Sequence, residues 1–115
     1  MSVVNYDEKN DVLILEIKKG KYEISEDFNG VIIDFDNNEN ILRIEILNFS
    51  YLVNRTKQEC KKFTGLKGNL IFDVDKQVCF KLMASTQGKI KNNLNFFYND
   101  KNMIFDKPIH QNITI

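Results

Sequence analysis

The sequence is poor in the residues from which many catalytic and metal sites are built. It contains one histidine, His110, and two cysteines, Cys60 and Cys79. A single histidine gives a histidine-based metal site or a Ser/His/Asp triad little to build on. The sequence also lacks a glycine-rich phosphate-binding loop in a strand-to-helix setting. We therefore expect a protein that is not an enzyme and that carries no cofactor.

Long apolar runs are missing as well. No run approaches the roughly 20 residues that cross a bilayer, and the first ten residues lack the basic and apolar segments of a secretory signal. We therefore expect a cytoplasmic location and no membrane partner. Cys60 and Cys79 are then expected to be reduced core residues, with a disulfide or a metal pair as the less favoured alternative.

The strongest pattern that is present lies between Gly30 and Leu47. Two alternating apolar segments flank the polar residues 37–40, and alternation with period two predicts a β-hairpin. One face is apolar throughout and is made by Val31, Ile33, Phe35, Leu42, Ile44 and Ile46. The other face mixes apolar and charged side chains, namely Ile32, Ile41, Leu47, Asp34, Arg43 and Glu45. The apolar face must be covered by another part of the chain.

The rest of the sequence predicts further strands and one helix. An amphipathic helix is expected near residues 51–63, with Ser50 as its N-cap and Gly65 as its stop. We expect its apolar stripe to cover the hairpins. Gly65 to Gly68 predicts a hinge-like break, and alternating segments then return until Pro108. Residues 109–115 are expected to form a tail or an edge strand.

Together these elements predict an α+β fold dominated by an antiparallel meander of about seven or eight strands. The length of 115 residues suits a single domain, residues 1–115. Its expected parts are a four-stranded sheet over 2–48, the helix over 51–63 and a β-meander over 69–106.

The formal net charge of zero hides two oppositely charged halves. Residues 1–49 hold five Lys/Arg and eleven Asp/Glu, for a net charge of −6. Residues 50–115 hold eleven Lys/Arg and five Asp/Glu, for a net charge of +6. The halves could be complementary and pack together, which we favour. Alternatively, the basic half could face an acidic partner or nucleic acid.

The N-terminal half resembles a known family. The opening Tyr6-Asp7, then Asp11, Leu13 and Leu15, is followed by the GVIIDFD segment from Gly30 and the IEIL segment from Ile44. Over residues 3–50 this combination resembles the small domain-of-unknown-function family numbered 2283. Arg43 stands where that family usually has a small residue, often glycine, and the C-terminal half departs from the family pattern.

The resemblance implies a four-stranded antiparallel sheet followed by a helix, and it supplies no catalytic residue. Some relatives are encoded beside toxin-like small proteins, which implies a regulatory or neutralising role. Our leading hypothesis is a non-enzymatic protein-binding or regulatory module of an antitoxin- or immunity-like kind. It would act through a sheet edge or through Asp34, Arg43 and Glu45 on the mixed hairpin face. A homodimer formed by edge pairing fits equally well.

Two other hypotheses rest on other side chains. A nucleic-acid-binding protein would use the basic C-terminal half, with Lys89, Lys91, Phe97 and Lys101 as the candidate residues. A metal-dependent hydrolase would use the carboxylates of Asp34, Asp36 and Glu45. For these three we favour solvated or paired carboxylates over a metal site.

Overall fold

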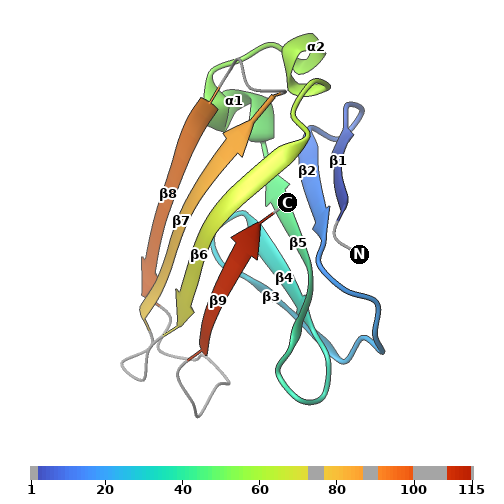
Figure 1. Ribbon diagram of the computed structural model, residues 1–115, viewed down its shortest axis with the longest axis vertical. Coiled ribbons are helices and arrows are strands. Elements are labelled where there is room, and N and C mark those ends of the chain that lie inside the picture. Colours follow the sequence, from blue (N-terminus) through green and yellow to red (C-terminus); the bar gives the residue numbers. More distant parts are fainter. Residues whose placement is uncertain (1–2, 73–76, 87–90, 100–108, 115) are drawn as a thin grey trace.

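The computed structural model describes residues 3–72, 77–86, 91–99 and 109–114 and shows two antiparallel sheets in two layers (Figure 1). The first sheet has the strand order β1-β2-β5-β4-β3. Its strands are β1 (Val3–Asp7), β2 (Val12–Glu16), β3 (Ile24–Asp27), β4 (Val31–Phe35) and β5 (Ile41–Leu47). The second sheet has the order β8-β7-β6-β9. Its strands are β6 (Gly65–Phe72), β7 (Gln77–Ser85), β8 (Lys91–Asn99) and β9 (Ile109–Thr114).

The two layers enclose one hydrophobic cluster. Each strand alternates between side chains that enter this cluster and side chains that face outward, as the period of two predicts. Phe28, beside β4, contacts Phe80 of β7 with ring centroids 5.8 Å apart, which joins the layers. The fully buried large residues are Phe28, Phe35, Phe49, Phe80, Leu13, Leu15, Ile33, Ile44, Ile46, Leu66 and Leu70.

The fold is β-rich and broadly α+β, but the predicted number and arrangement of strands are wrong. The described residues form nine strands rather than seven or eight. The N-terminal sheet has five strands rather than four, because Ile24–Asp27 pairs with β4 along its edge. The expected edge strand after Pro108 exists as β9, and it pairs with β6 rather than extending the meander beyond β8. Residues 100–108, which include the end of the meander expected over 69–106, lie outside the described residues.

The predicted helix over 51–63 is two short helices, α1 (Phe49–Val53) and α2 (Lys57–Cys60). Asn54 ends α1 in the left-handed conformation, with φ 53° and ψ 49°, which Asn tolerates well. Thr56 then begins α2 with a capping box to Glu59. Both helices lie at one end of the two layers (Figure 1). The second sheet, and not a helix, therefore covers the apolar face of the hairpin.

A β-bulge changes which residues of the hairpin face the core. Asp34 pairs with Arg43 while Phe35 pairs with Ile41, so Leu42 is the extra residue. Ile41 therefore joins the core cluster, although the alternation assigned Leu42 to that face. Leu42 is buried instead beneath the segment after β2, where its carbonyl accepts the Ile17 backbone N–H at 2.9 Å.

The predicted break at residues 65–68 is part of β6. Gly68 pairs with Leu82 of β7 and has φ +154°. A Cβ atom at this position would lie 1.9 Å from the Lys81 carbonyl oxygen. The glycine therefore permits a close approach of two strands, which is a recognised use of glycine inside a strand.

The acidic half of the sequence forms the first sheet, and the basic half forms the second. The strands of the first sheet contain six Asp and Glu, one Arg and no Lys, whereas those of the second contain three Lys and no Asp or Glu. The two layers meet through apolar side chains. The two halves therefore do pack together, as we favoured from the sequence, but apolar side chains rather than complementary charges join the described strands.

Neither described helix is long and apolar enough to cross a membrane.

Candidate outer-face site of the N-terminal sheet

The outward side of the first sheet forms a surface that we call the acidic face. Its charged residues are Asp7, Glu16, Asp27, Asp34, Arg43 and Glu45, with one positive and five negative charges and a net charge of −4. Its partly exposed apolar residues are Val3, Ile14, Ile32 and Leu47. The strand register places all of these residues on the side opposite the core. The acidic face thus combines apolar area with negative charge.

Arg43 lies at the centre of this face. It pairs in register with Glu16 of β2 on one side and Asp34 of β4 on the other. Its guanidinium makes a salt bridge to Glu45 with an N–O distance of 3.1 Å. Arg43 Nε is buried and makes no hydrogen bond among the described residues. The three predicted partner-binding residues, Asp34, Arg43 and Glu45, are therefore neighbours on one surface.

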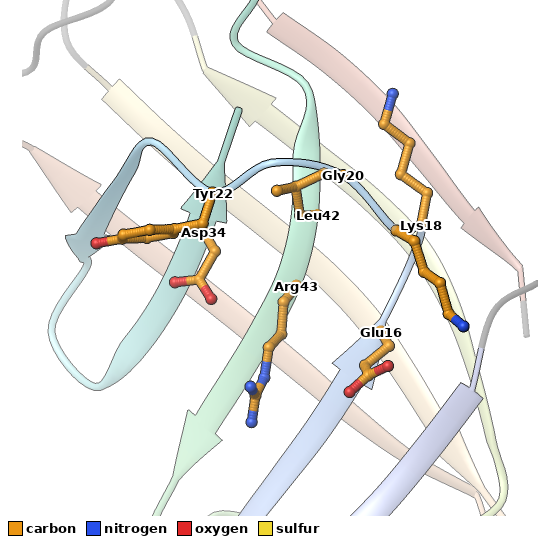
Figure 2. A pocket seen from close by; sticks show the side chains of 8 residues that line it. Glu16, Lys18, Gly20, Tyr22, Asp34, Leu42 and Arg43 are labelled. Carbon is orange, nitrogen blue, oxygen red and sulfur yellow. The ribbon is translucent and has the colours of Figure 1, made fainter. Parts of the chain in front are cut away.

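A shallow hollow opens beside Arg43 (Figure 2). Its volume is about 220 Å³, which is smaller than the roughly 300–1,000 Å³ of ordinary small-molecule sites. The hollow is the size of one or two side chains. It is lined by Glu16, Lys18, Lys19, Gly20, Tyr22, Asp34, Leu42 and Arg43.

The wall formed by Lys18, Lys19, Gly20 and Tyr22 could not be placed on this surface from the sequence. These residues lie in an irregular segment between β2 and β3, and no periodicity shows where such a segment runs. It is held in place by the bulge, because the Ile17 and Lys18 backbone N–H groups both donate to the Leu42 carbonyl.

The candidate metal residues do not form a shared cluster. The carboxylate of Asp36 accepts the backbone N–H groups of Asn38 and Asn40, each at 2.9 Å, and these bonds close the hairpin turn. The hydrogen bonds from Asn40 hold the pKa of the Asp36 carboxyl below its usual range. Asp34 accepts the Ser25 hydroxyl, and Glu45 pairs with Arg43. Across the described part of the chain, no three His, Cys, Asp or Glu side chains are placed to hold a metal ion.

A second polar cluster joins the first hairpin to α1. Asp11 Oδ1 accepts the Tyr6 hydroxyl at 2.6 Å and the Ser50 backbone N–H at 2.9 Å, while Oδ2 accepts the Ser50 hydroxyl at 2.6 Å. Burial would raise the pKa of the Asp11 carboxyl, but the bonds from Ser50 and Tyr6 outweigh it and keep the pKa low. Burial and the Asp11 carboxylate raise the pKa of Tyr6. Because these bonds anchor α1, we interpret the cluster as structural.

The cysteines and the histidine belong to α2 and to the second sheet, not to the hairpin that carries Asp34, Asp36 and Glu45. Cys60 is a free and fully buried thiol of α2. Burial, with Asp11 nearby, raises the pKa of the Cys60 thiol, which is the opposite of what a thiolate nucleophile needs. Cys79 of β7 is free and half-buried. His110 is exposed on β9 opposite Ile71.

The predicted nucleic-acid residues belong to the opposite layer. Lys91 begins β8 and is exposed. Phe97 pairs through its backbone with Cys79 of β7, while its side chain lies outside the described part of the structure. Lys89 and Lys101 lie outside the described residues.

The family resemblance over the N-terminal sheet is confirmed. Residues 4–50 match the model of the family described as "Protein of unknown function (DUF2283)". The match covers β1 to β5 and the first residues of α1. A relative from Methanocaldococcus jannaschii, described as an uncharacterized protein, is 37% identical over 59 residues. That alignment covers 51% of this chain and 51% of the relative, so the chain spans about half the length of the curated relative it matches. No solved structure matches the chain.

Proposed function

We propose, from the premise that residues 4–50 match the model of this family of unknown function, that the chain is a non-enzymatic protein-binding module. The acidic face would bind a partner whose surface is basic. The observation that carries this proposal is the combination of Ile14, Ile32 and Leu47 with negative charge on one outward surface. The net charge is −4 over the strand positions and −2 when Lys18 and Lys19 on the wall of the hollow are included. Protein interfaces pair an apolar centre with charged groups that select the partner.

Charge argues against a symmetric dimer through this face. In a two-fold dimer the same patch meets itself, so two surfaces of net negative charge would face each other. Like charges placed against each other cost several kcal/mol, on the order of what excludes a wrong partner. A basic partner avoids this repulsion. Self-association through the edge strands β1 or β3 remains a distinct outcome that the experiment below separates.

The hollow beside Arg43 gives the face a place for a single anchoring side chain. Interface energy is concentrated in a few side chains that fill pockets, and a volume of about 220 Å³ suits one such group. Its walls carry charges of both signs, and the Tyr22 ring and Leu42 offer contacts for an apolar stem. We therefore infer that the anchor is a partner side chain with an apolar stem and a polar end. A cytoplasmic, antitoxin- or immunity-like setting belongs to the same proposal.

The test is affinity capture from an extract of the organism that encodes the chain, with three matched baits. One bait is the wild type, the second is Glu16→Lys with Glu45→Lys on the acidic face, and the third is Lys67→Glu with Lys81→Glu on the opposite sheet. All four positions are outward-facing. The proposal predicts a protein that binds the wild type and the third bait and is depleted at least tenfold on the second.

Two outcomes contradict the proposal. A protein captured equally by all three baits does not use the acidic face. If the wild type captures nothing, light scattering decides what remains: a dimer indicates strand pairing between copies, and a monomer removes the binding hypothesis.

A further inference from the structure

The outward side of the second sheet is a separate surface, which we call the basic face. It carries Lys67 on β6, Lys81 on β7 and Lys91 on β8, and all three side chains are exposed. Strands β6 to β9 contain no Asp or Glu. The connecting loops carry charges of both signs outside the described residues, so we build on the strands alone. Figure 1 shows these four strands side by side as the layer opposite β1–β5.

The strand register shows how the lysines are distributed. Lys81 pairs with Asn69 and Lys67 pairs with Met83, so the two lysines are diagonal neighbours on adjacent strands. Diagonal neighbours on one face of an antiparallel pair are about 7–8 Å apart. Lys91 pairs with Ser85 at the start of β8. Positive charge is therefore spread obliquely across three strands instead of being concentrated at one point.

Amide side chains fill much of the space between the lysines. Asn69 lies between Lys81 and Asn112 in one cross-strand row, which continues to Asn95 on β8. Asn93 stands beside Met83 in the next row. These outward asparagines are all exposed. An Asn side chain both donates and accepts hydrogen bonds, which suits the mixed edges of unpaired bases, and Met83 and Ile71 add apolar area for base faces.

We propose that the basic face binds single-stranded nucleic acid. Lysines would neutralise phosphates, the asparagines would bond base edges, and the flat sheet would support bases that are not paired. Single strands fit better than a duplex, because reading a duplex groove usually needs a projecting helix or ribbon, and α1 and α2 lie at the end of the layers instead of on this face. This inference is independent of the protein-binding proposal, which uses the opposite surface.

The experiment is fluorescence anisotropy with labelled oligothymidine and oligouridine of about 12 nucleotides, within the known site sizes of sheet-based binders. The log of the affinity should fall with the log of salt concentration with a slope near −2, since each neutralised phosphate of a single strand contributes about −0.7. By the same relation, each Lys→Gln change on the face should weaken binding roughly five- to tenfold at low salt. The triple variant Lys67→Gln, Lys81→Gln and Lys91→Gln should show no measurable binding.

A matched control changes the same net charge at a different place. Lys9, Lys21 and Lys62 are exposed, and they lie between strands or after α2, outside β6–β9 and outside the hollow. Replacing these three with Gln should change the affinity less than twofold. Circular dichroism and the melting temperature should be unchanged in both triple variants, because all six side chains are exposed.

Three results would overturn the proposal. The first is no anisotropy change for the wild type at low salt. The second is equal weakening by the two triple variants, which indicates dependence on net charge alone. The third is that the wild-type protein without nucleic acid sediments as an oligomer, whereas the Lys67/Lys81/Lys91 variant sediments as a monomer. In that case the acidic face of a second copy occupies the basic face.

Discussion

Asp11 is a carboxylate that connects the first hairpin to α1. It joins Tyr6 of β1 to Ser50 of α1, and its own backbone carbonyl accepts the Phe49 N–H at 3.1 Å. Tyr6 and Asp11 are also residues on which the family resemblance rests. Their geometry explains the pattern as a requirement of folding, because the carboxylate fixes where the chain leaves the sheet and enters the helix.

Replacing Asp11 with Asn should lower the free energy of unfolding at pH 7 by about 1–3 kcal/mol, since bonds to an ionised group are lost. The pKa of Asp11 is lower in the folded protein than its ordinary value of 3.8. Its contribution is therefore complete above that value and disappears as the pH falls through the folded pKa. Urea unfolding of the wild type and the variant should give a stability difference that narrows below about pH 4. A difference independent of pH would contradict this account.

Gly68 tests the close approach of β6 and β7. Gly68→Ala should destabilise the protein by about 3 kcal/mol or more, because the backbone must move to relieve a 1.9 Å contact with the Lys81 carbonyl. Gly30→Ala is the matched control, since Gly30 also has positive φ, +97°, but a Cβ there meets nothing within 4 Å. The Gly30→Ala change should lower the free energy of unfolding by about 1–2 kcal/mol. Thermal unfolding that shows the control to be as destabilised as Gly68→Ala would be inconsistent with the contact.

At the scale of elements, the break between α1 and α2 shows what periodicity misses. The spacing of Val53, Cys60 and Phe63 suits one helix, and all three residues are indeed buried. Helix α1 nevertheless ends at Asn54, and helix α2 begins after its N-cap residue Thr56. Both residues are common cap residues, and that local signal competes with the apolar stripe. The stripe predicts which residues are buried but not the conformation that buries them.

The break gives a prediction whose sign distinguishes two helices from one. The backbone of Asn54 is in the left-handed conformation. Asn54→Gly should therefore leave the free energy of unfolding nearly unchanged, whereas Asn54→Ala should lower it by about 1 kcal/mol. In a continuous helix the order would reverse, since Gly is about 1 kcal/mol less favourable than Ala there. Chemical denaturation of both variants measures the order directly. Greater stability of Asn54→Ala would restore the single helix over 51–63.

The hairpin from Gly30 to Leu47 was the element most readily predicted from sequence. Its alternation places Val31, Ile33 and Phe35 in the core, as the structure shows. The bulge that exchanges Ile41 for Leu42 left no trace in the alternation, because both residues are apolar. It depends on the segment after β2, whose Ile17 and Lys18 N–H groups donate to the carbonyl of Leu42, a residue distant in sequence.

At the scale of the whole molecule, the sequence revealed two oppositely charged halves but not their arrangement. Complementary halves could have packed charge against charge. Apolar side chains fill both inner surfaces instead, so the charged positions of the strands, apart from Glu26 of β3, face outward on opposite sides. The predicted site residues follow this division: Asp34, Arg43 and Glu45 lie together on the acidic face, and Lys91 lies on the basic face. Which strands form which layer depends on long-range pairing that a single sequence does not encode locally.

The separation of charge between the two faces can be measured without any partner. Two small paramagnetic probes, one anionic and one cationic, are added in turn to isotope-labelled protein at low salt, and amide relaxation is compared residue by residue. Amides of β6–β9 should relax faster with the anionic probe, and those of β1–β5 with the cationic probe, because each probe concentrates near opposite charge. Equal effects of the two probes on both sheets would contradict the account.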